Sequence, residues 1–201
     1  MADEKRKYQK RRRAELEAET RRRITESAVE LHGTVGPSRT SFSAVAERAG
    51  VRRSTLYRHF PDEKALFAAC SAHWGAENPP PDLDGWAAVA DPDERLRMAL
   101  VELYAYYGRT ERMMENLIRD EETVPTVKHF FAAFHDYLAA ARDVLLRGRG
   151  ARGGARRRLA AAIGHALAFQ SWRSLVREQR LDDAQAVELM ARMISAAPPA
   201  R

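Results

Sequence analysis

The fold is decided by residues 40–66, which read TSFSAVAERAGVRRSTLYRHFPDEKAL. Gly50 stands where a chain leaves a helix, and its φ is expected to be positive. Apolar residues recur at helical spacing on both sides of this glycine: Val45, Ala46, Ala49, Leu56 and Phe60. The stretch therefore predicts a helix-turn-helix, whose second helix fits the major groove of DNA. An ordinary helical hairpin with a solvated charged face is the alternative.

Three stretches carry a resemblance to a known family: residues 24–31, AERAGV at 46–51 and TLYRHFP at 55–61. Through them, residues 21–66 resemble the DNA-binding domain of the TetR family (tetracycline-repressor-like transcription factors). The family usually has a serine after the Gly-Val turn and a glycine two residues later, where this chain has Arg52 and Ser54. Arginine cannot cap a helix with its side chain as serine does, but it adds a cation near the phosphates.

The outward face of the second helix is rich in groups that donate hydrogen bonds to base edges or phosphates. The resemblance implies phosphate contacts for Thr40, Tyr57 and Lys64, the last at a helix N-terminus, which favours anions. Arg58 either contacts DNA or pairs with Glu47, and His59 either contacts DNA or packs against its own helix. The predicted DNA-binding residues are Thr40, Ser41, Arg52, Arg53, Ser54, Thr55, Tyr57, Arg58, His59 and Lys64.

The net charge of +6 is concentrated at the N-terminus, since residues 1–23 hold ten Lys or Arg and five Asp or Glu. This basic arm either reaches phosphates beside the groove and steepens the salt dependence of binding, or is a disordered solubilising tail. No apolar core of a signal peptide and no apolar stretch of membrane-spanning length is present. Together with a single cysteine, Cys70, expected to be a buried inert thiol, this indicates a cytoplasmic protein.

Strand patterns are nearly absent, so the fold class is all-α, with about nine helices. Four domains are expected: a basic arm at 1–20, the helix-turn-helix domain at 21–75, a Pro-rich linker at 76–91 and an effector-binding and dimerisation domain at 92–201. The expected helices cover residues 17–34, two stretches within 40–60, 62–75, 92–108, 110–121, a segment beginning near 125, 155–180 and 183–196.

The second domain of this family usually encloses a small-molecule pocket, so the resemblance implies a small-molecule effector. Aromatic and thioether side chains that could line an apolar pocket are Tyr104, Tyr107, Met113, Met114, Phe130, Phe134, Tyr137 and Trp172. The same side chains would build a filled core equally well.

The last two helices are apolar over much of their circumference, which indicates burial on two sides. A second copy of the chain is the simplest cover for the second side, giving a four-helix interface about a two-fold axis. The predicted interface residues are Leu159, Ile163, Leu167, Val187, Met190 and Ile194.

Two patterns resemble cofactor sites without their context. Residues 148–153 match GxGxxG, but a helical pattern precedes them where the dinucleotide motif needs a strand, so a helix–helix linker is expected. His129 and His135 lie six residues apart, off a common helix face, so no metal site is predicted. No cofactor and no enzyme chemistry is indicated.

The leading hypothesis is a homodimeric repressor that a small apolar ligand releases from a near-palindromic DNA operator. A ligand-independent or activating regulator of the same type remains open. A nonspecific architectural DNA-binding protein, which the basic arm would suit, and an enzyme with an appended DNA-binding domain are the other classes.

Overall fold

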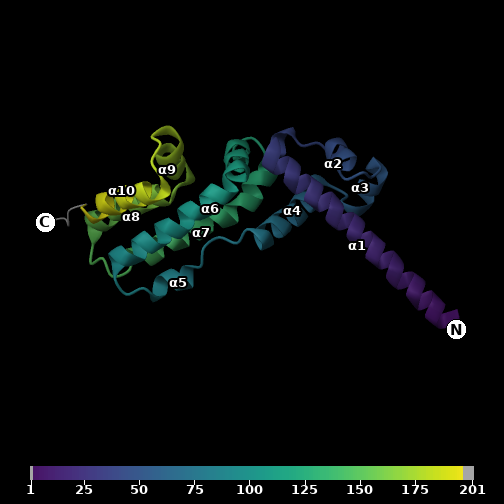
Figure 1. Ribbon diagram of the computed structural model, residues 1–201, viewed down its shortest axis with the longest axis horizontal. Coiled ribbons are helices and arrows are strands. Elements are labelled where there is room, and N and C mark those ends of the chain that lie inside the picture. The colour runs from purple at the N-terminus through teal and green to yellow at the C-terminus, as the bar shows by residue number, and fades with distance from the viewer. Residues whose placement is uncertain (1, 197–201) are drawn as a thin grey trace. The chain divides into compact units, whose positions relative to one another are not determined.

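The computed structural model describes residues 2–196, and all regular structure in that range is helical. The all-α prediction is confirmed. The chain forms two compact units (Figure 1). Unit 1 holds the residues up to Asn78 together with Glu115–Phe130, and unit 2 holds Pro79–Met114 and the chain from Phe131 onward. The division differs from the expected domains, because residues 115–130 pack with the N-terminal unit.

Helix α1 spans Ala2–Thr34 and is much longer than the expected 17–34. Its first part is rich in Ala, Glu, Lys and Arg, which favour helix. Charge pairs one turn apart support it, with Arg11 bonded to Glu15 and Arg13 to Glu17. Figure 1 shows this part of α1 extending away from the other helices of unit 1. The basic arm is therefore a continuation of the first helix.

The helix-turn-helix prediction is matched by α2 (Phe42–Arg48) and α3 (Arg53–His59). Gly50 has φ 63°, and the amides of Gly50 and Val51 donate to the carbonyls of Glu47 and Ala46. This pair of bonds is a Schellman motif, which needs a residue in the left-handed region at the position of the glycine. The turn between the two helices thus follows from the residue expected to make it.

Helix α4 (Glu63–Glu77) closes the three-helix core of unit 1 against α1. Asp62 caps α4 by accepting a hydrogen bond from the amide of Ala65. The Cys70 thiol is buried here, and burial raises its pKa to about 12, as expected of an inert thiol. The buried core consists of Ile24, Ala28, Val45, Ala46, Ala49, Leu56, Phe60, Leu66 and Cys70.

A long helix, α6 (Pro92–Glu121), replaces the two helices expected at 92–108 and 110–121. The break was expected near Gly108, but a single glycine costs a helix only about 1 kcal/mol relative to alanine. Burial of the flanking Tyr104, Tyr107 and Met114 outweighs that cost. Helix α7 (Pro125–Leu146) follows α6 after a short turn, and η1 (Pro37–Arg39) is a 3-10 turn ahead of α2.

Unit 2 adds α5 (Leu83–Ala88), α8 (Gly153–Leu167), α9 (Phe169–Arg173), the π turn η2 (Ser174–Glu178) and α10 (Asp183–Ser195). Helix α5 lies within the expected linker. The helix expected at 155–180 breaks at Ala168, whose backbone is extended. The hydroxyls of Tyr104 and Tyr107 donate to the carbonyls of Ala166 and Leu167, which stabilises the interrupted helix end.

Candidate DNA-binding surface

The two faces of α3 differ in burial and chemistry. Leu56 and the following Phe60 are fully buried in the core of unit 1 and hold the helix in place. The opposite face is polar and basic. Its exposed residues are Arg52, Arg53, Ser54, Tyr57 and Arg58, while Thr55 is half-buried. This face matches the donor-rich surface that the sequence predicts for a recognition helix.

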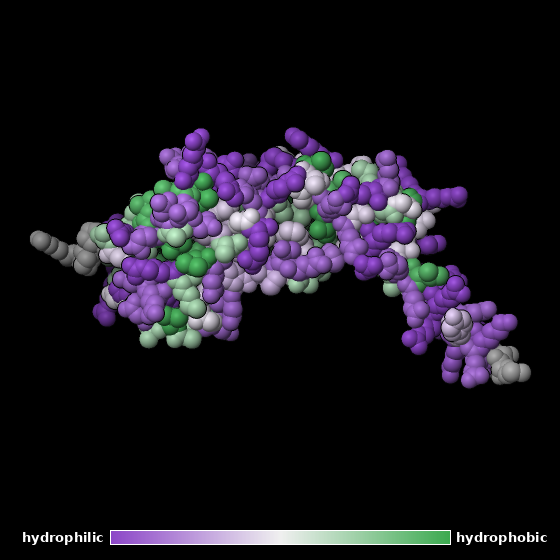
Figure 2. Space-filling view, viewed as in Figure 1, coloured by the Kyte–Doolittle hydropathy of each residue, from purple (hydrophilic) through white to green (hydrophobic). Residues whose placement is uncertain are grey.

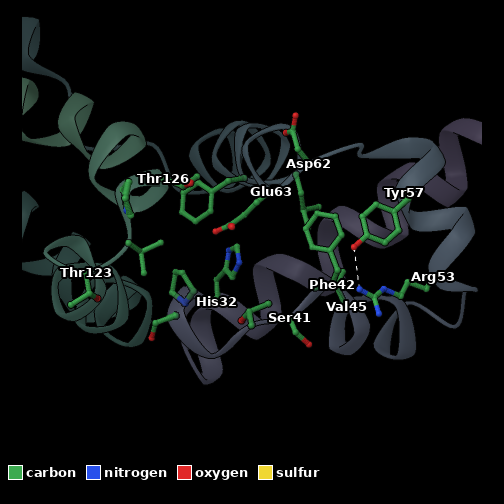
Figure 3. A pocket seen from close by; sticks show the side chains of 17 residues that line it. His32, Ser41, Phe42, Val45, Arg53, Tyr57, Asp62, Glu63, Thr123 and Thr126 are labelled. Carbon is green, nitrogen blue, oxygen red and sulfur yellow. Dashed lines mark hydrogen bonds between the residues drawn. The ribbon is translucent and has the colours of Figure 1, made fainter.

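The Tyr57 side chain is fixed by neighbours on both of its sides. Arg53 donates a hydrogen bond to the Tyr57 hydroxyl over 3.2 Å, and its guanidinium lies over the ring, 5.5 Å from the centroid. The Phe42 ring lies 5.2 Å from the Tyr57 ring. Figure 3 shows Arg53 and Tyr57 joined in this way. A tyrosine held like this presents its hydroxyl at the protein surface with little loss of side-chain entropy on binding.

The start of α3 has no side-chain cap. Arg52 occupies the N-cap position with φ −70° and ψ 146°, and its side chain makes no cap hydrogen bond. This agrees with the expectation drawn from arginine in place of serine. The first bonds of the helix run from the amides of Thr55 and Leu56 to the Arg52 carbonyl, over 2.9 and 3.1 Å.

The other predicted phosphate contacts flank α3. Thr40 donates its hydroxyl to the Gly36 carbonyl over 2.8 Å, and Ser41 caps α2 by accepting from the Ala44 amide. Lys64 is exposed in the first turn of α4. Both hydroxyls therefore already stabilise their own loop. Ser41 keeps its hydroxyl proton to donate to a phosphate, whereas Thr40 would have to release the Gly36 carbonyl to do so.

His59 ends α3 and is only half-exposed. Its Nε2 atom is buried with no hydrogen-bond partner, and its carbonyl accepts from Arg21 over 2.7 Å. Burial lowers the pKa of the imidazole, and the nearby Arg58 and Arg21 lower it further. Of the two roles weighed for His59, this geometry favours packing. Arg21, which sequence reasoning did not select, also covers the Phe60 ring at 4.1 Å.

The loop that carries Thr40 and Ser41 is anchored to the end of α6 within unit 1. The Asp120 carboxylate accepts from the Ser38 amide over 2.9 Å and from Arg119 over 2.8 Å. Arg119 also donates to the Val35 carbonyl, and Asn116 donates to the His32 carbonyl. No local pattern predicts this network, because the bonds that tie the loop to α6 join residues 82 to 84 positions apart.

A cleft of about 840 Å³ opens beside α3 within unit 1 (Figure 3). Its walls come from the end of α1, the α2 start, α3, α4 and the turn between α6 and α7. Four of the predicted DNA-binding residues line it: Thr40, Ser41, Arg53 and Tyr57.

The predicted ligand-binding residues do not line this cleft. Most are core residues of unit 2, whereas Phe130 belongs to unit 1 and stacks on Phe67. Their polar atoms are used within the unit, since Tyr137 donates to the Pro81 carbonyl and Trp172 to Asp183. Tyr104, Tyr107, Met113, Met114 and Trp172 are buried, and Phe134 and Tyr137 are half-buried. A ligand pocket among them stays a prediction.

The predicted dimer residues are largely covered within one chain. Ile163, Leu167, Val187, Met190 and Ile194 are at most 7 % exposed, and Leu159 is half-buried. Apolar spacing marks a buried face but not which element buries it, and here other helices of unit 2 do so. The exposed large hydrophobic side chains of α10 are Leu189 and Met193 instead.

The two patterns that resemble cofactor sites lie around the start of α8 and on α7. Gly148 and Gly150 have positive φ in the connection between α7 and α8, and Gly153, also with positive φ, is the first residue of α8, which agrees with a linker between helices. His129 packs edge-on against Phe130, and His135 against Phe131. Across residues 2–196 no cluster of three potential metal ligands occurs, and no helix is long and apolar enough to cross a membrane.

Residues 24–70 match the family model described as bacterial regulatory proteins, tetR family. This match confirms the resemblance for the segment that forms the end of α1, α2, α3 and about half of α4. No match is found among curated protein sequences.

Solved structures share the fold over most of the chain. A TetR-like transcriptional regulator from Rhodococcus sp. RHA1 has a TM-score of 0.64 at 20 % identity, covering 88 % of this chain and 93 % of that one. The TetR family transcriptional regulator PfmR from Thermus thermophilus has a TM-score of 0.59 at 18 % identity, covering 87 % and 93 %. Another transcriptional regulator from Rhodococcus sp. Rha1 reaches 0.57 at 19 % identity, covering 87 % and 95 %. The likeness establishes a TetR-like fold.

Proposed function

We propose that this chain is a sequence-specific DNA-binding transcriptional regulator that reads the major groove with α3. The observation that carries the proposal is the two-sided character of this helix. Leu56 and Phe60 fix it to the core, and the exposed face presents Arg52 and Arg53 to a partner. A bidentate arginine contact to guanine is worth about 1–3 kcal/mol of discrimination, so two arginines suffice for a sequence preference.

The regulator acts as a homodimer on a near-palindromic operator, because two-fold protein symmetry is mirrored by the symmetry of its site. The exposed Leu189 and Met193 of α10 are the proposed contacts with the second copy. Figure 2 shows hydrophobic surface over the part of the molecule that holds α8, α9 and α10. Met193→Glu is expected to convert a dimer to monomers in sedimentation experiments. Leu16→Glu, at an exposed leucine of α1, is the matched control and should leave the dimer intact.

The proposed direction of control is repression, with release of the operator by a small apolar ligand bound among the aromatic residues of unit 2. The family resemblance supports this part of the proposal. An activating or ligand-independent regulator of the same type is the second candidate, because the sign of control depends on where the operator lies relative to a promoter. The protein is proposed to act in the cytoplasm and to have no catalytic activity.

The decisive experiment is sequencing of DNA fragments selected from a random pool by the purified protein at physiological salt. A near-palindromic motif is expected, and its half-site spacing reports the dimer. Arg52→Ala with Arg53→Ala should abolish or relax the motif while the protein stays folded. Arg142→Ala, at a half-exposed arginine of α7, serves as the control. Selection of fragments without any common motif would instead identify a nonspecific DNA-binding protein.

A further inference from the structure

The cleft beside α3 has the properties of a small-molecule site that the proposed function does not use. Its volume of about 840 Å³ lies within the usual range for ligand pockets. The base of the cleft is closely packed, since Val45 is fully buried and Leu66 and Phe67 are at most 6 % exposed, so the apolar surface that a ligand could reach comes mainly from the more exposed Phe42 and Tyr57. The Phe42 ring forms part of the wall beside Tyr57. An apolar or aromatic body would replace water along these walls favourably.

The charged side chains of the cleft are not equivalent. Arg53 is held against Tyr57 at one end. The Asp62 carboxylate caps α4, and Figure 3 shows it pointing away from the cavity. The Glu63 carboxylate instead points into the cavity, toward the His32 imidazole (Figure 3). Across residues 2–196 Glu63 has no ion-pair partner, so its exposed carboxylate, in the first turn of α4, faces the cleft without a cationic side chain beside it.

His32 does not neutralise that charge at neutral pH. Burial lowers the pKa of its imidazole to about 4, although the nearby Asp120 opposes the shift. The ring is 7 % exposed and is tilted against Phe67 at 5.1 Å between centroids. A neutral imidazole adds a hydrogen-bonding group to the wall without adding charge.

We propose that this cleft binds a small organic cation, an ammonium group on an aromatic or branched apolar body, with Glu63 as its counter-ion. The occupant and DNA exclude one another, because Thr40, Arg53 and Tyr57 line the cleft and also belong to the proposed DNA-binding surface. The exclusion rests on the proposed function, whereas binding of the cation does not. By linkage, DNA lowers the affinity for the cation by the same factor as the cation lowers the affinity for DNA.

The site is tested by calorimetric titration of the full chain with three probes of one skeleton: diphenylbutylamine, diphenylbutanol and diphenylbutyrate. The protonated amine is expected to bind about fivefold or more tightly than the neutral alcohol, and the carboxylate most weakly. Equal affinity for the three probes, or preference for the carboxylate, would overturn the proposal.

Two variants identify the counter-ion. Glu63→Gln keeps the shape of the side chain and should weaken amine binding about fivefold without changing alcohol binding. Glu77→Gln removes an acid from the other end of the same helix, where it lies next to His73, and should change neither. Unchanged amine affinity in Glu63→Gln, or an equal loss in both variants, would refute the assignment.

Two further experiments test where the amine binds and whether bound amine prevents DNA binding. Thr126→Trp should fill the cleft from its α7 side and abolish amine binding; amine binding that survives it places the site elsewhere. Saturating amine should weaken operator binding, and less so in Glu63→Gln. Amine binding without any effect on operator binding would disprove the exclusion alone. A protein that selects no DNA motif would refute the proposed function and leave the calorimetric test of the site standing.

Discussion

Asp120 accepts a hydrogen bond from the backbone amide of Ser38 over 2.9 Å, although the two residues are 82 positions apart. Through it the end of α6 fixes the loop that leads to Thr40 and Ser41. Burial alone would raise the pKa of the Asp120 carboxyl, but the hydrogen bonds from Arg119 and Ser38 outweigh burial and hold the pKa below its ordinary value of 3.8. The carboxylate form is therefore part of the folded structure.

Asp120→Asn is expected to lower the free energy of unfolding by about 1–3 kcal/mol at neutral pH, since it replaces charge-assisted hydrogen bonds by neutral ones. Because the folded pKa is depressed, this stabilisation is fully present above the unfolded pKa and disappears as the pH falls through the folded one. Urea unfolding of both proteins between pH 7 and acid should therefore show their stabilities converging below about pH 4. Asp143→Asn, on exposed α7 surface, is the control. A constant difference at every pH would contradict the assignment.

Arg52→Ser should stabilise the protein and weaken its binding to DNA. Serine at the N-cap of α3 would accept a hydrogen bond that arginine does not, which is worth about 1 kcal/mol. DNA affinity should fall, because the substitution removes a guanidinium beside the groove. Urea unfolding and operator binding, measured on the same preparations, separate the two effects. Arg52→Ala should weaken DNA binding without any gain in stability, and a gain of equal size in both variants would rule out capping as its cause.

The basic arm should determine part of the salt dependence of DNA binding. Lys5, Arg12 and Arg23 are exposed and share one face of α1, because Arg12 and Arg23 follow Lys5 by 7 and 18 residues. Replacing Lys5 and Arg12 by Gln is expected to reduce the slope of log K against log salt by about 0.9 for each phosphate that the arm no longer neutralises.

The matched control for the arm replaces Arg11 and Arg13, which are paired with Glu15 and Glu17, by Gln. These cations are already neutralised in part, so their loss should change the slope less. Equal slopes for all three proteins would show that the arm does not touch DNA, in agreement with the alternative of a solubilising segment.

Two glycines with positive φ should differ in their tolerance of alanine. Gly50→Ala introduces a Cβ that meets no atom within 4 Å, so it should cost only the conformational strain of about 1–2 kcal/mol. At Gly36, φ is 95°, and a Cβ would collide with the Arg119 guanidinium and lie 2.8 Å from an Asp120 oxygen. Gly36→Ala should therefore destabilise more.

A double-mutant cycle can separate the cost of the collision with Arg119 from the backbone strain in Gly36→Ala. In an Arg119→Ala background, Gly36→Ala should lose part of its excess over Gly50→Ala, because the collision with the guanidinium is gone. Thermal or urea unfolding of the four proteins measures the coupling. Strict additivity would show that backbone strain alone accounts for the effect.

Much of unit 1 follows from local sequence. The turn at Gly50, the buried Leu56 and Phe60 and the cap by Asp62 each depend on residues within one helical turn, so their pattern identifies them. The cleft was not foreseen, because it joins α1 and α4 to the turn between α6 and α7. The hydrogen bond from Arg21 to the His59 carbonyl was not predicted either, because the two residues are 38 positions apart.

In unit 2 the sequence located apolar faces but not their partners. Ile163 and Met190 carry the spacing of a buried face, and that spacing is the same whether a neighbouring helix or a second subunit covers it. Ala168 has no property that forbids a helix, and the carbonyls that precede the break accept hydrogen bonds from the distant hydroxyls of Tyr104 and Tyr107. The unbroken course of α6 through Gly108 is likewise decided by tertiary burial.

The continuity of α1 has a practical consequence for labelling. Ile24 and Ala28 anchor this helix in the core, and its earlier turns carry on along the same axis for about 1.5 Å per residue. A fluorophore attached near Tyr8 would therefore rotate with the whole N-terminal unit and not on its own. Its anisotropy would follow the tumbling of that unit directly, and an N-terminal tag would stand clear of α3.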